Sequence, residues 1–381
     1  MSQPRRVLHL ITSLDVGGVQ NQLAKVVSSY DRESFTPSVC CLSDKGEIGG
    51  ELEQNGLEVQ ALGEEVSGFN PRLLLRLYRL LRAEKVSILR AHKYRSAFYG
   101  VLAGRMAKVP AIVPSFHLPQ AVRKPRRRLM IRLLALLSDE VVAVSYAVKE
   151  NLVDSIGIPR SKVKVIHNGV DLTDFQNLPS KEEAKRRLGV PPGRLVIGAV
   201  GRMKAQKGYS FLLQALPLLK EGGLSNFWVI MVGEGEARSS LEREARDLGC
   251  GEKVHFLGMR RDVPFLLRGM DVFAFPSLWE GFGTSLVEAM AAEVPAIASD
   301  LPCVREIIPD ERYGLLVPPR DVQALAAGIV KFRGDGKLRE SVVEAAKDRA
   351  FQSFSLGKVV SAYQDLFREV LARKRTEEGI V

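Results

Sequence analysis

The sequence has few of the residues that build a disulfide framework or a metal site. Four cysteines occur in 381 residues, Cys40, Cys41, Cys250 and Cys303, and two of them are adjacent. The five histidines are scattered, without the His-x-x-x-His or His-Glu-x-x-His spacing of zinc proteins. No Asp-x-Asp pair of the kind that clamps a metal ion occurs. We therefore expect a protein of a reducing compartment with no metal centre.

Long apolar runs are missing as well. No uncharged apolar stretch reaches the roughly 18 residues of a transmembrane helix, and the best candidate, residues 133–148, is broken by Asp139 and Glu140. The apolar run 7–11 that follows the basic N-terminus is too short for a signal peptide. With 46% hydrophobic and 26% charged residues, the chain is not mostly disordered either. These features predict a cytoplasmic globular protein of two or three domains.

Positive charge is concentrated in one segment. Residues 72–132 contain sixteen Lys and Arg residues and one acidic residue, Glu84, which is more than enough to account for the net charge of +11. An excess of this size favours an anionic partner, such as a phosphate, a nucleic acid or a lipid headgroup. Nucleic acid fits least, because no recognition motif accompanies the charge.

Short apolar runs alternate with segments of helical period in both halves of the chain. Strands are predicted in the first half at residues 7–12, 38–42, 58–62, 87–92, 112–116, 141–145 and 163–167, and in the second half at 195–201, 227–233, 254–258, 272–276, 295–299 and 314–317. Helices such as 20–30 and 71–83 lie between them. This alternation is typical of parallel sheets that are covered by helices on both faces.

The region between the two series of strands predicts a domain boundary. Residues 168–194 contain an Asn-Gly turn, three prolines and a charged run. We predict two doubly wound, Rossmann-like α/β domains that face each other across a cleft. They are assigned to residues 1–170 and 195–355, joined by a linker at 171–194, with a C-terminal helix at 356–381 that packs back on the first domain. Such sheets bind ligands at the carboxyl ends of their strands, so the cleft is the expected site.

A glycine-bearing turn follows the first strand of each half. In the first half it is Gly17-Gly18, which would let a ligand approach a helix N-terminus, although a plain tight turn would look the same. In the second half it is GRMKAQKG, where Arg202 and Lys207 offer a planar fork and a point charge for phosphate oxygens. The alternative there is a solvated charged loop.

The most informative stretch is EGFGTSLVEAM, which begins at residue 280 and joins a strand to a helix. Its glycines would present N–H groups at a helix N-terminus, which suits a phosphate or a sugar hydroxyl. Glu280 in the loop and Glu288 in the helix would be able to face one pocket. The alternatives are a surface carboxylate for Glu280 and a capping box formed by Ser285 and Glu288.

Three histidines stand at the ends of predicted strands. His92 and His117 end their strands on the carboxyl side, where the cleft is expected, but an isolated histidine is more often structural. His167 precedes an Asn-Gly turn and is expected only to shape that turn.

The spacing Glu280-x7-Glu288 resembles the EX7E signature of the retaining glycosyltransferases of family 4, which have the two-domain GT-B fold. Other segments are similar to that family in order and spacing: Gly17-Gly18, Ser145 in AVSYAVKENL, VIHNGVD, GRMKAQKG, VGEGEARSSLE and VHFLGMRRDVPFLL. The resemblance spans nearly the whole chain. It is loosest in the first 160 residues, as expected where acceptors differ.

The resemblance implies catalytic roles for four residues: His117, Arg202, Lys207 and Glu280. Arg202 and Lys207 would bind the donor diphosphate in place of a metal ion, Glu280 would contact the donor sugar, and His117 would lie near that sugar. It also implies a set of donor-binding residues: Gly17, Gly18, Gly281, Phe282, Gly283, Thr284 and Glu288, the last on the ribose hydroxyls. The donor would be a UDP- or GDP-linked sugar, and no separate cofactor is implied.

The chain departs from the family pattern at two places. VIHNGVD has His167 where many members have proline, and Leu301-Pro302-Cys303 replaces a frequent Gly-Gly. These differences leave the identity of the sugar open and do not touch the class of reaction.

The basic segment suits an acceptor at a membrane. A helix capped by Asn70 and begun by Pro71 would carry four arginines on one face: Arg72, Arg76, Arg79 and Arg82. A second basic group comprises Arg123, Lys124, Arg126, Arg127 and Arg128. Each such residue near an anionic leaflet is worth on the order of 1 kcal/mol. The alternatives are a solvated face and a pocket for a soluble anionic acceptor.

We expect a cytoplasmic glycosyltransferase, peripheral at the inner face of the cell membrane, that builds a lipid-linked glycan, a lipopolysaccharide or a polysaccharide. Its implied partners are the donor, a glycan or glycolipid acceptor and an anionic membrane surface. Two other classes remain as alternatives. A nucleotide-sugar epimerase of the same fold needs no acceptor, which the basic segment disfavours. A non-catalytic nucleotide-sugar or membrane-binding protein would have no need of intact Arg202, Lys207, Glu280 and Glu288.

Overall fold

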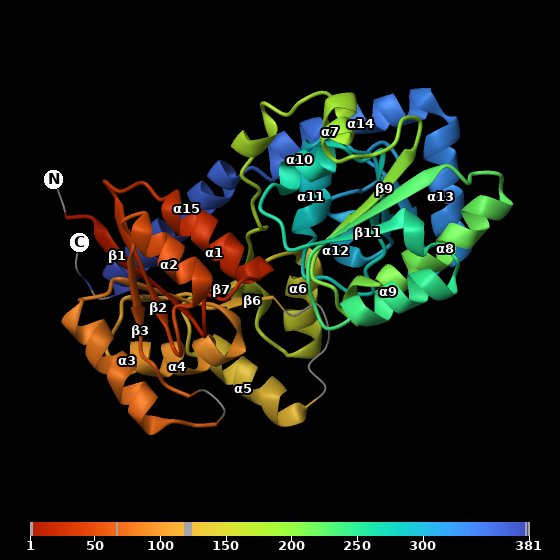
Figure 1. The fold of residues 1–381 in the computed structure, drawn as a ribbon. Helices are drawn as coiled ribbons and strands as arrows, with labels where there is room; N and C mark the ends of the chain where they lie inside the picture. Colours follow the sequence, from red (N-terminus) through yellow and green to blue (C-terminus); the bar gives the residue numbers. More distant parts are fainter. Residues whose placement is uncertain (1–2, 66–67, 118–123, 378, 380–381) are drawn as a thin grey trace. The chain divides into compact units, whose positions relative to one another are not determined.

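The computed structural model describes residues 3–65, 68–117, 124–377 and 379, and it divides into two compact units (Figure 1). The first unit comprises Met1–Gly169 and Leu356–Val381, and the second comprises Val170–Ser355. The predicted linker at 171–194 lies in the second unit, where helix α7 (Lys181–Arg187) is held by an ion pair of 2.6 Å between Lys185 and Asp271. This segment is therefore folded and does not form a free connection.

The strands of the first unit form two parallel sheets. The larger has the order β3-β2-β1-β4-β5 and the smaller has the order β6-β7-β8. The bounds are β1 (Arg5–Ile11), β2 (Phe35–Cys41), β3 (Glu58–Ala61), β4 (Ile88–Ala91), β5 (Ala111–Ile112), β6 (Ser115–Phe116), β7 (Val141–Ala143) and β8 (Val163–Val165). The strand predicted at 112–116 is wrong in one respect, because it is divided into β5 and β6. Pro114 lies between them and has no N–H to donate to a neighbouring strand.

Helices cover both faces of the five-stranded sheet (Figure 1). One face carries α1 (Gly18–Ser28), α2 (Gly46–Gln54) and the C-terminal helix α15 (Leu356–Glu377). The other face carries α3 (Pro71–Ala83) and α4 (Lys93–Met106), and the unit also contains α5 (Pro125–Leu136) and α6 (Tyr146–Glu150). Helix α15 buries Tyr363 and Phe367 in the same cluster as Val7 and Ile88 of the sheet. The last helix of the chain is therefore part of the core of the first unit.

Helix α3 follows from local signals in the sequence. The side chain of Asn70 accepts a hydrogen bond of 3.1 Å from the N–H of Leu73, and Pro71 occupies the first helical position. Three leucines at helical spacing are buried: Leu73, Leu77 and Leu81. The four arginines of the predicted basic face are exposed: Arg72, Arg76, Arg79 and Arg82. The predicted bounds of 71–83 are confirmed.

The second unit is built on a six-stranded parallel sheet with the order β11-β10-β9-β12-β13-β14. Its strands are β9 (Leu195–Val200), β10 (Phe227–Val232), β11 (Val254–Gly258), β12 (Val272–Phe275), β13 (Ala296–Ser299) and β14 (Leu315–Val317). Its remaining helices are α8 (Tyr209–Glu221), α9 (Arg238–Asp247), α10 (Val263–Arg268), α11 (Thr284–Ala291), α12 (Pro302–Arg305), α13 (Val322–Gly334) and α14 (Gly336–Ser353).

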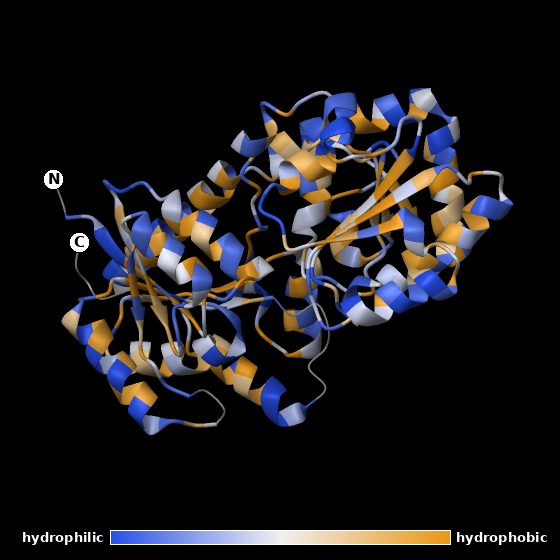
Figure 2. Cartoon of the chain, in the orientation of Figure 1, coloured by the Kyte–Doolittle hydropathy of each residue, from blue (hydrophilic) through white to orange (hydrophobic). Residues whose placement is uncertain are grey.

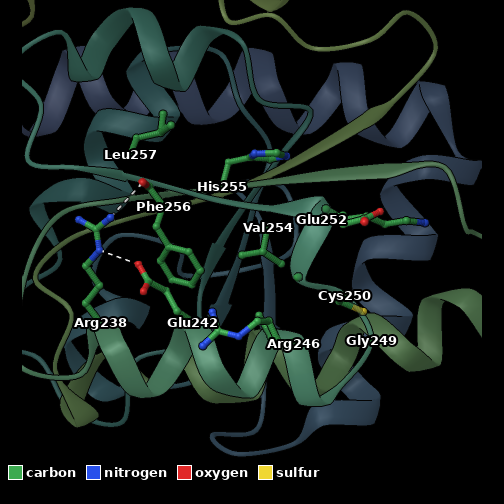
Figure 3. Close-up of a pocket in the computed structure, with 13 residues that line it drawn as sticks. Arg238, Glu242, Arg246, Gly249, Cys250, Glu252, Val254, His255, Phe256 and Leu257 are labelled. Atoms are coloured by element: carbon green, nitrogen blue, oxygen red, sulfur yellow. Dashed lines mark hydrogen bonds and ion pairs between the residues drawn. The ribbon is translucent and has the colours of Figure 1, made fainter.

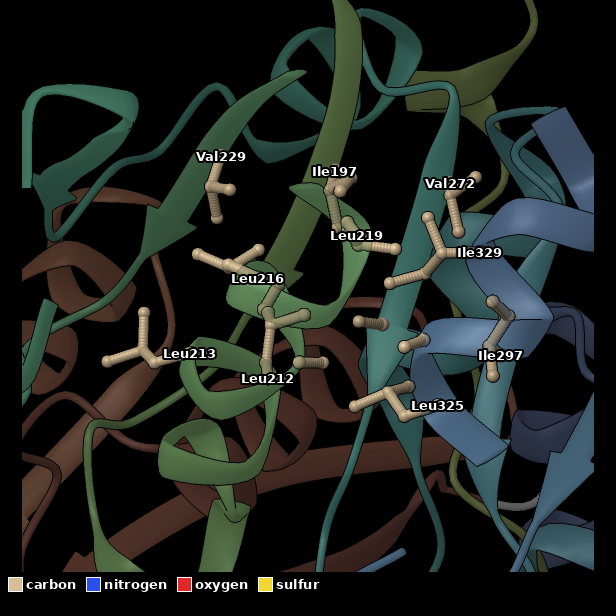
Figure 4. Packing of buried hydrophobic residues seen from close by; sticks show 14 of the residues in the cluster. Ile197, Leu212, Leu213, Leu216, Leu219, Val229, Val272, Ile297, Leu325 and Ile329 are labelled. Carbon is tan, nitrogen blue, oxygen red and sulfur yellow. The ribbon is translucent and has the colours of Figure 1, made fainter. Parts of the chain in front are cut away.

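The core of the second unit lies between the sheet and helices α8 and α13 (Figure 4). Leucines of α8, among them Leu212 and Leu216, pack toward Ile197 of β9, and Ile329 of α13 packs beside Val272 of β12. In each unit the strands are mostly hydrophobic, and the helices around them present both hydrophobic and hydrophilic residues (Figure 2). This face of the sheet is thus covered by helices, as expected of a doubly wound domain.

The five-stranded sheet of the first unit and the six-stranded sheet of the second unit place their loops in the same manner. In each of them the chain leaves the first strand in one direction along the sheet and later returns to the other side of that strand. The strand order therefore reverses between β1 and β4 in the first unit and between β9 and β12 in the second. Loops at the carboxyl ends of these strands border the crevice where such folds bind ligands. The prediction of two doubly wound α/β domains is confirmed. Within the part of the chain that is described, no helix is long and apolar enough to cross a membrane.

Candidate functional site

Two loops of the second unit meet beside the reversal point between β9 and β12. Lys207 ends a short 3₁₀ helix, η4 (Ala205–Lys207), and Glu280 lies in the loop that follows β12. The ammonium nitrogen Nζ of Lys207 is 2.5 Å from Oε1 of Glu280, and the hydroxyl of Ser277 donates to the same oxygen at 2.9 Å. The structure thus brings together a cation and a carboxylate that the sequence analysis assigned to one donor.

Backbone contacts hold these two loops against each other. The N–H of Leu278 donates to the carbonyl of Gln206 at 2.8 Å, and the side-chain amide of Gln206 donates to the carbonyl of Trp279 at 2.8 Å. Gln206 is a residue of this contact that was not predicted, although it stands inside GRMKAQKG beside Lys207. Its position in that motif is the signal that would have identified it.

Gly208 makes the close approach of the loops possible. Its φ of +63° lies in the left-handed region, and a Cβ atom at this position would lie 2.0 Å from the carbonyl oxygen of Pro276. A side chain would therefore clash with the backbone of the loop that carries Glu280. The glycine is required by the contact between the two loops.

Helix α11 begins directly after the loop that carries Glu280. Gly283 is its N-cap residue, with a φ of +133°, and Thr284 is its first helical residue. Ser285 is therefore inside the helix and cannot cap it, so the alternative of a capping box with Glu288 is wrong. Glu288 is half-buried about one turn into the helix. The first turn of α11 follows this loop directly, and the N–H groups at a helix N-terminus can bind an anion.

Other predicted donor residues are distributed over both units. Arg202 is exposed at the start of the loop after β9, and Gly281 is half-buried while Phe282 is buried. In the first unit, Gly17 is the N-cap residue of α1, and a Cβ atom at Gly18 would meet nothing within 4 Å. The roles of these residues and the cleft between the domains stay predictions.

His117 follows β6 in the first unit and is half-buried. Burial, together with the positive charges of Arg90 and Lys93, lowers the pKa of His117 to about 3. Its Nε2 atom is buried and has no hydrogen-bond partner within the described part of the chain. At neutral pH the ring is therefore uncharged, and it has a polar atom available for a contact.

His92 belongs to a buried hydrogen-bonded chain in the interior of the first unit. Its Nε2 lies 3.1 Å from Nδ1 of His9, and Nε2 of His9 lies 3.0 Å from the hydroxyl of Tyr30. Burial and the charge of Arg90 hold the pKa of both histidines well below the ordinary value of 6.5. This favours the structural interpretation of His92. The ring of His167 packs edge-on against Tyr146, with 6.0 Å between the ring centres.

The basic residues of α5 lie beside an exposed row of leucines. Lys124 and the arginines Arg126, Arg127 and Arg128 are exposed, whereas Arg123 lies outside the described residues. Four leucines on the same helix or just after it are also exposed: Leu129, Leu133, Leu136 and Leu137. Their spacing places them along one side of α5. The exposure of these leucines was not predicted from the sequence.

A hollow of about 800 Å³ lies at the edge of the six-stranded sheet, between α9 and β11 (Figure 3). Arg238 pairs with Glu242 at 2.8 Å and donates to the carbonyl of Phe256 at 3.4 Å on its wall. The residues that line it include none of the predicted donor or catalytic residues. In the described ranges, no group of three or more His, Cys, Asp and Glu residues gathers as a metal site would require.

Both halves of the chain match known families. Residues 16–174 match the family described as Glycosyltransferase Family 4, and residues 180–349 match Glycosyl transferases group 1. The chain is similar to the UDP-Gal:alpha-D-GlcNAc-diphosphoundecaprenol alpha-1,3-galactosyltransferase of Escherichia coli. The two are 27% identical over 381 residues, and the match covers 97% of this chain and 98% of that protein. It is also 27% identical over 219 residues to the lipopolysaccharide core biosynthesis mannosyltransferase LpsB of Rhizobium meliloti, covering 54% of this chain and 61% of that protein.

Solved structures share the fold. HepE of Anabaena in complex with UDP superimposes with a TM-score of 0.84 at 23% identity, covering 96% of this chain and all of that one. A glycosyltransferase from Rickettsia africae gives a TM-score of 0.84 at 22% identity, covering 96% of this chain and 99% of that one. These likenesses establish the GT-B fold.

Proposed function

Because the chain belongs to the glycosyltransferases of family 4, we propose that it moves a sugar from a nucleotide-diphosphate sugar to a lipid-linked, lipopolysaccharide or polysaccharide acceptor. The observation that carries the proposal is the half-buried contact of Lys207 with Glu280, in loops that follow neighbouring parallel strands. A cation and a carboxylate at this edge suit a donor with an anionic diphosphate and a sugar rich in hydroxyl groups.

The proposed chemistry is transfer with retention of configuration. The bond from the anomeric carbon to the diphosphate oxygen breaks, and a bond from the acceptor oxygen to the same carbon forms on the same face. The departing phosphate takes the proton of the acceptor hydroxyl. Lys207 and Arg202 oppose the negative charge that grows on the diphosphate, and this stabilises the transition state. With the cations supplied by side chains, neither a metal ion nor a cofactor is required.

The remaining residues bind and orient the donor. Glu280 contacts the sugar, Glu288 holds the ribose hydroxyls, and the backbone of the first turn of α11 faces the phosphate. From the first unit, the proposal takes Gly17, Gly18 and His117 as donor contacts, His117 as a neutral imidazole that donates or accepts without adding charge.

We propose a UDP-linked or GDP-linked hexose as donor and an acceptor held at the inner face of the cell membrane. The Escherichia coli relative, which by its name uses UDP-Gal and a diphosphoundecaprenol-linked sugar, favours UDP and a lipid-linked acceptor. Exposed arginines beside exposed leucines on α5 suit peripheral binding to an anionic leaflet. Four buried free cysteines suit a reducing cytoplasm.

The test is an incubation of the purified protein with a panel of UDP- and GDP-sugars, first alone and then with polyprenyl-diphosphate-linked sugar acceptors. We expect slow release of free sugar from one donor and a faster transfer when an acceptor is present. NMR of the product should show the same anomeric configuration as in the donor. Interconversion of donor epimers without release would instead support an epimerase, and donor binding without any reaction would support a non-catalytic protein.

A further inference from the structure

The short helix α12 contacts the Glu280 loop through Cys303. Cys303 is the second residue of α12 and is 2% exposed. Its thiol sulfur Sγ donates to the backbone carbonyl oxygen of Glu280 at 3.4 Å. The same residue is thus held from two directions, with its carboxylate against Lys207 and Ser277 and its peptide carbonyl against Cys303.

The turn that carries Cys303 is itself fixed to the sheet. The N–H of Asp300 donates to the carbonyl of Val317 in β14 at 2.8 Å, and the carboxylate of Asp300 pairs with Arg305 at 2.6 Å. Ile307, just beyond the turn, lies so close to Gly283 that a Cβ atom there would be 3.1 Å from its Cδ1. The loop from Glu280 to Gly283 therefore contacts Cys303 of α12 at its first residue and Ile307, just after α12, at its last.

The chemistry of the thiol suits a lasting hydrogen bond. Burial and the neighbouring carboxylates of Glu280 and Glu306 raise the pKa of Cys303 to about 12, so the thiol keeps its proton at neutral pH.

We infer that Cys303 is a positioning residue that fixes the Glu280 peptide and thereby helps to decide which donor sugar is accepted. The inference rests on the proposed function and deepens it, because it concerns the sugar end of the same donor site. Glu280 is the residue proposed to contact the sugar, and a rotation of its peptide would move its carboxylate relative to the sugar hydroxyls. Such a movement should change kcat/KM differently for two epimers that differ in the direction of one hydroxyl. It should affect the contacts of the diphosphate, which the epimers share, much less.

The second unit contains a matched control. Cys250 is 1% exposed, and its thiol donates to the carbonyl of Leu248 at 3.5 Å. It stands in the turn between α9 and β11, on the wall of the hollow that holds none of the donor residues. Cys250→Ala therefore removes the same atoms, from the same degree of burial, and the same kind of hydrogen bond as Cys303→Ala.

The experiment compares the parent, Cys303→Ala, Cys303→Ser and Cys250→Ala with two UDP-hexose epimers, measuring kcat, KM and melting temperature. We expect Cys303→Ala to change the ratio of kcat/KM between the epimers about two- to fivefold, the size of one lost S–H···O hydrogen bond. Cys303→Ser should restore part of the ratio, because its hydroxyl also donates. Cys250→Ala should lower the melting temperature by a similar amount and leave the ratio unchanged.

Three outcomes would contradict the inference. An active parent whose epimer ratio responds equally to Cys303→Ala and Cys250→Ala would reduce Cys303 to a packing residue. The same holds if Cys303→Ala lowers kcat/KM equally for both epimers. A parent that turns over no sugar nucleotide at all would overturn the proposed function itself, and the role of Cys303 with it.

Discussion

Lys207 and Glu280 form an ion pair of 2.5 Å, and their side chains are only 19% and 10% exposed. The two residues are 73 positions apart in the sequence, and they meet because β9 and β12 are neighbours in the sheet. A pair shielded from water in this way is held in place before any donor arrives. An incoming diphosphate would find the cation already positioned, which is the condition for strong stabilisation of developing charge.

Removal of this cation should abolish most of the activity. Lys207→Ala is expected to lower kcat by about 100- to 1000-fold, because the charge opposite the leaving group is lost. Arg202→Ala should behave alike. Lys204→Ala is the control, since Lys204 stands in the same loop but pairs with Glu236 at 3.7 Å. Near-normal rates of donor hydrolysis or transfer in both Lys207→Ala and Arg202→Ala would show that the donor site is assigned to the wrong residues.

Activity should not depend on a metal ion. Because the proposed leaving-group charge is balanced by Arg202 and Lys207, the initial rate should survive dialysis against EDTA and should not rise when Mg²⁺ or Mn²⁺ is added back. The measurement is the rate of UDP or GDP release at fixed donor concentration. A complete loss that the metal restores would contradict this account of the leaving group.

The sequence predicts those parts of the fold and the site that depend on local signals. Helix α3 has its predicted bounds because local signals determine them: the Asn70 cap, Pro71 and the helical spacing of the leucines all lie within 13 residues. The family resemblance implied that Lys207 and Glu280 serve one donor, and their nearness agrees with the general rule for the carboxyl ends of parallel strands, but their ion pair was not predicted. The parallel sheets follow from the alternation of apolar strands with amphipathic helices.

Contacts set by turn geometry could not be predicted in this way. Cys303 contacts Glu280 although the two are 23 residues apart, and no spacing in the sequence predicts a hydrogen bond between this thiol and that loop. The capping box at Ser285 failed because Gly283, with its positive φ, takes the cap position two residues earlier. His9 was not singled out because its partner His92 directly follows another strand, β4, and the register of β1 against β4 becomes visible only in the folded sheet.

The first unit should lose stability in mild acid. The pKa of His9, His92 and His117 is lowered in the folded protein, so below about pH 6.5 the unfolded chain binds more protons than the folded one. The stabilisation is complete above the unfolded pKa and is lost as the pH falls, by up to about 1.4 kcal/mol per pH unit for each histidine. Melting temperatures between pH 8 and pH 5 should fall, and more gently in His9→Gln. Parallel curves for the two proteins would contradict the buried neutral state of His9.

The C-terminal helix should be anchored by one particular arginine. Arg373 of α15 pairs with Glu140 at 3.0 Å, and the carboxylate is 3% exposed. Arg373→Ala would leave that carboxylate buried without its cation, and we expect a loss of about 1–3 kcal/mol in the free energy of unfolding, since the arginine itself is partly exposed. Arg368→Ala is the control on the same helix, because its ion pair with Asp365 is exposed on both sides. Equal losses in urea unfolding would rule out the special position of Arg373.

Binding to membranes should depend on the charge of α5. Arg126, Arg127 and Arg128 are exposed in its first turn, and Leu129 and Leu133 are exposed beyond them. Attraction between such charges and an anionic surface is screened within about 8–10 Å at physiological salt. The protein should therefore bind vesicles that contain phosphatidylglycerol, bind phosphatidylcholine vesicles poorly, and dissociate as salt rises. Sedimentation of vesicles with bound protein measures all three.

Substitution separates a docking surface from a merely solvated one. Replacement of the three arginines by serine should weaken sedimentation with anionic vesicles and leave donor hydrolysis unchanged, because the proposed leaving-group cations belong to the second unit. The matched control replaces three exposed arginines of the second unit by serine, Arg243, Arg246 and Arg333, so that the net charge falls equally. If only total charge mattered, both triple variants would lose binding to the same degree. If the α5 variant bound anionic vesicles as well as the parent does, these arginines would be a solvated face or would serve a soluble anionic acceptor, and the membrane proposal would fail.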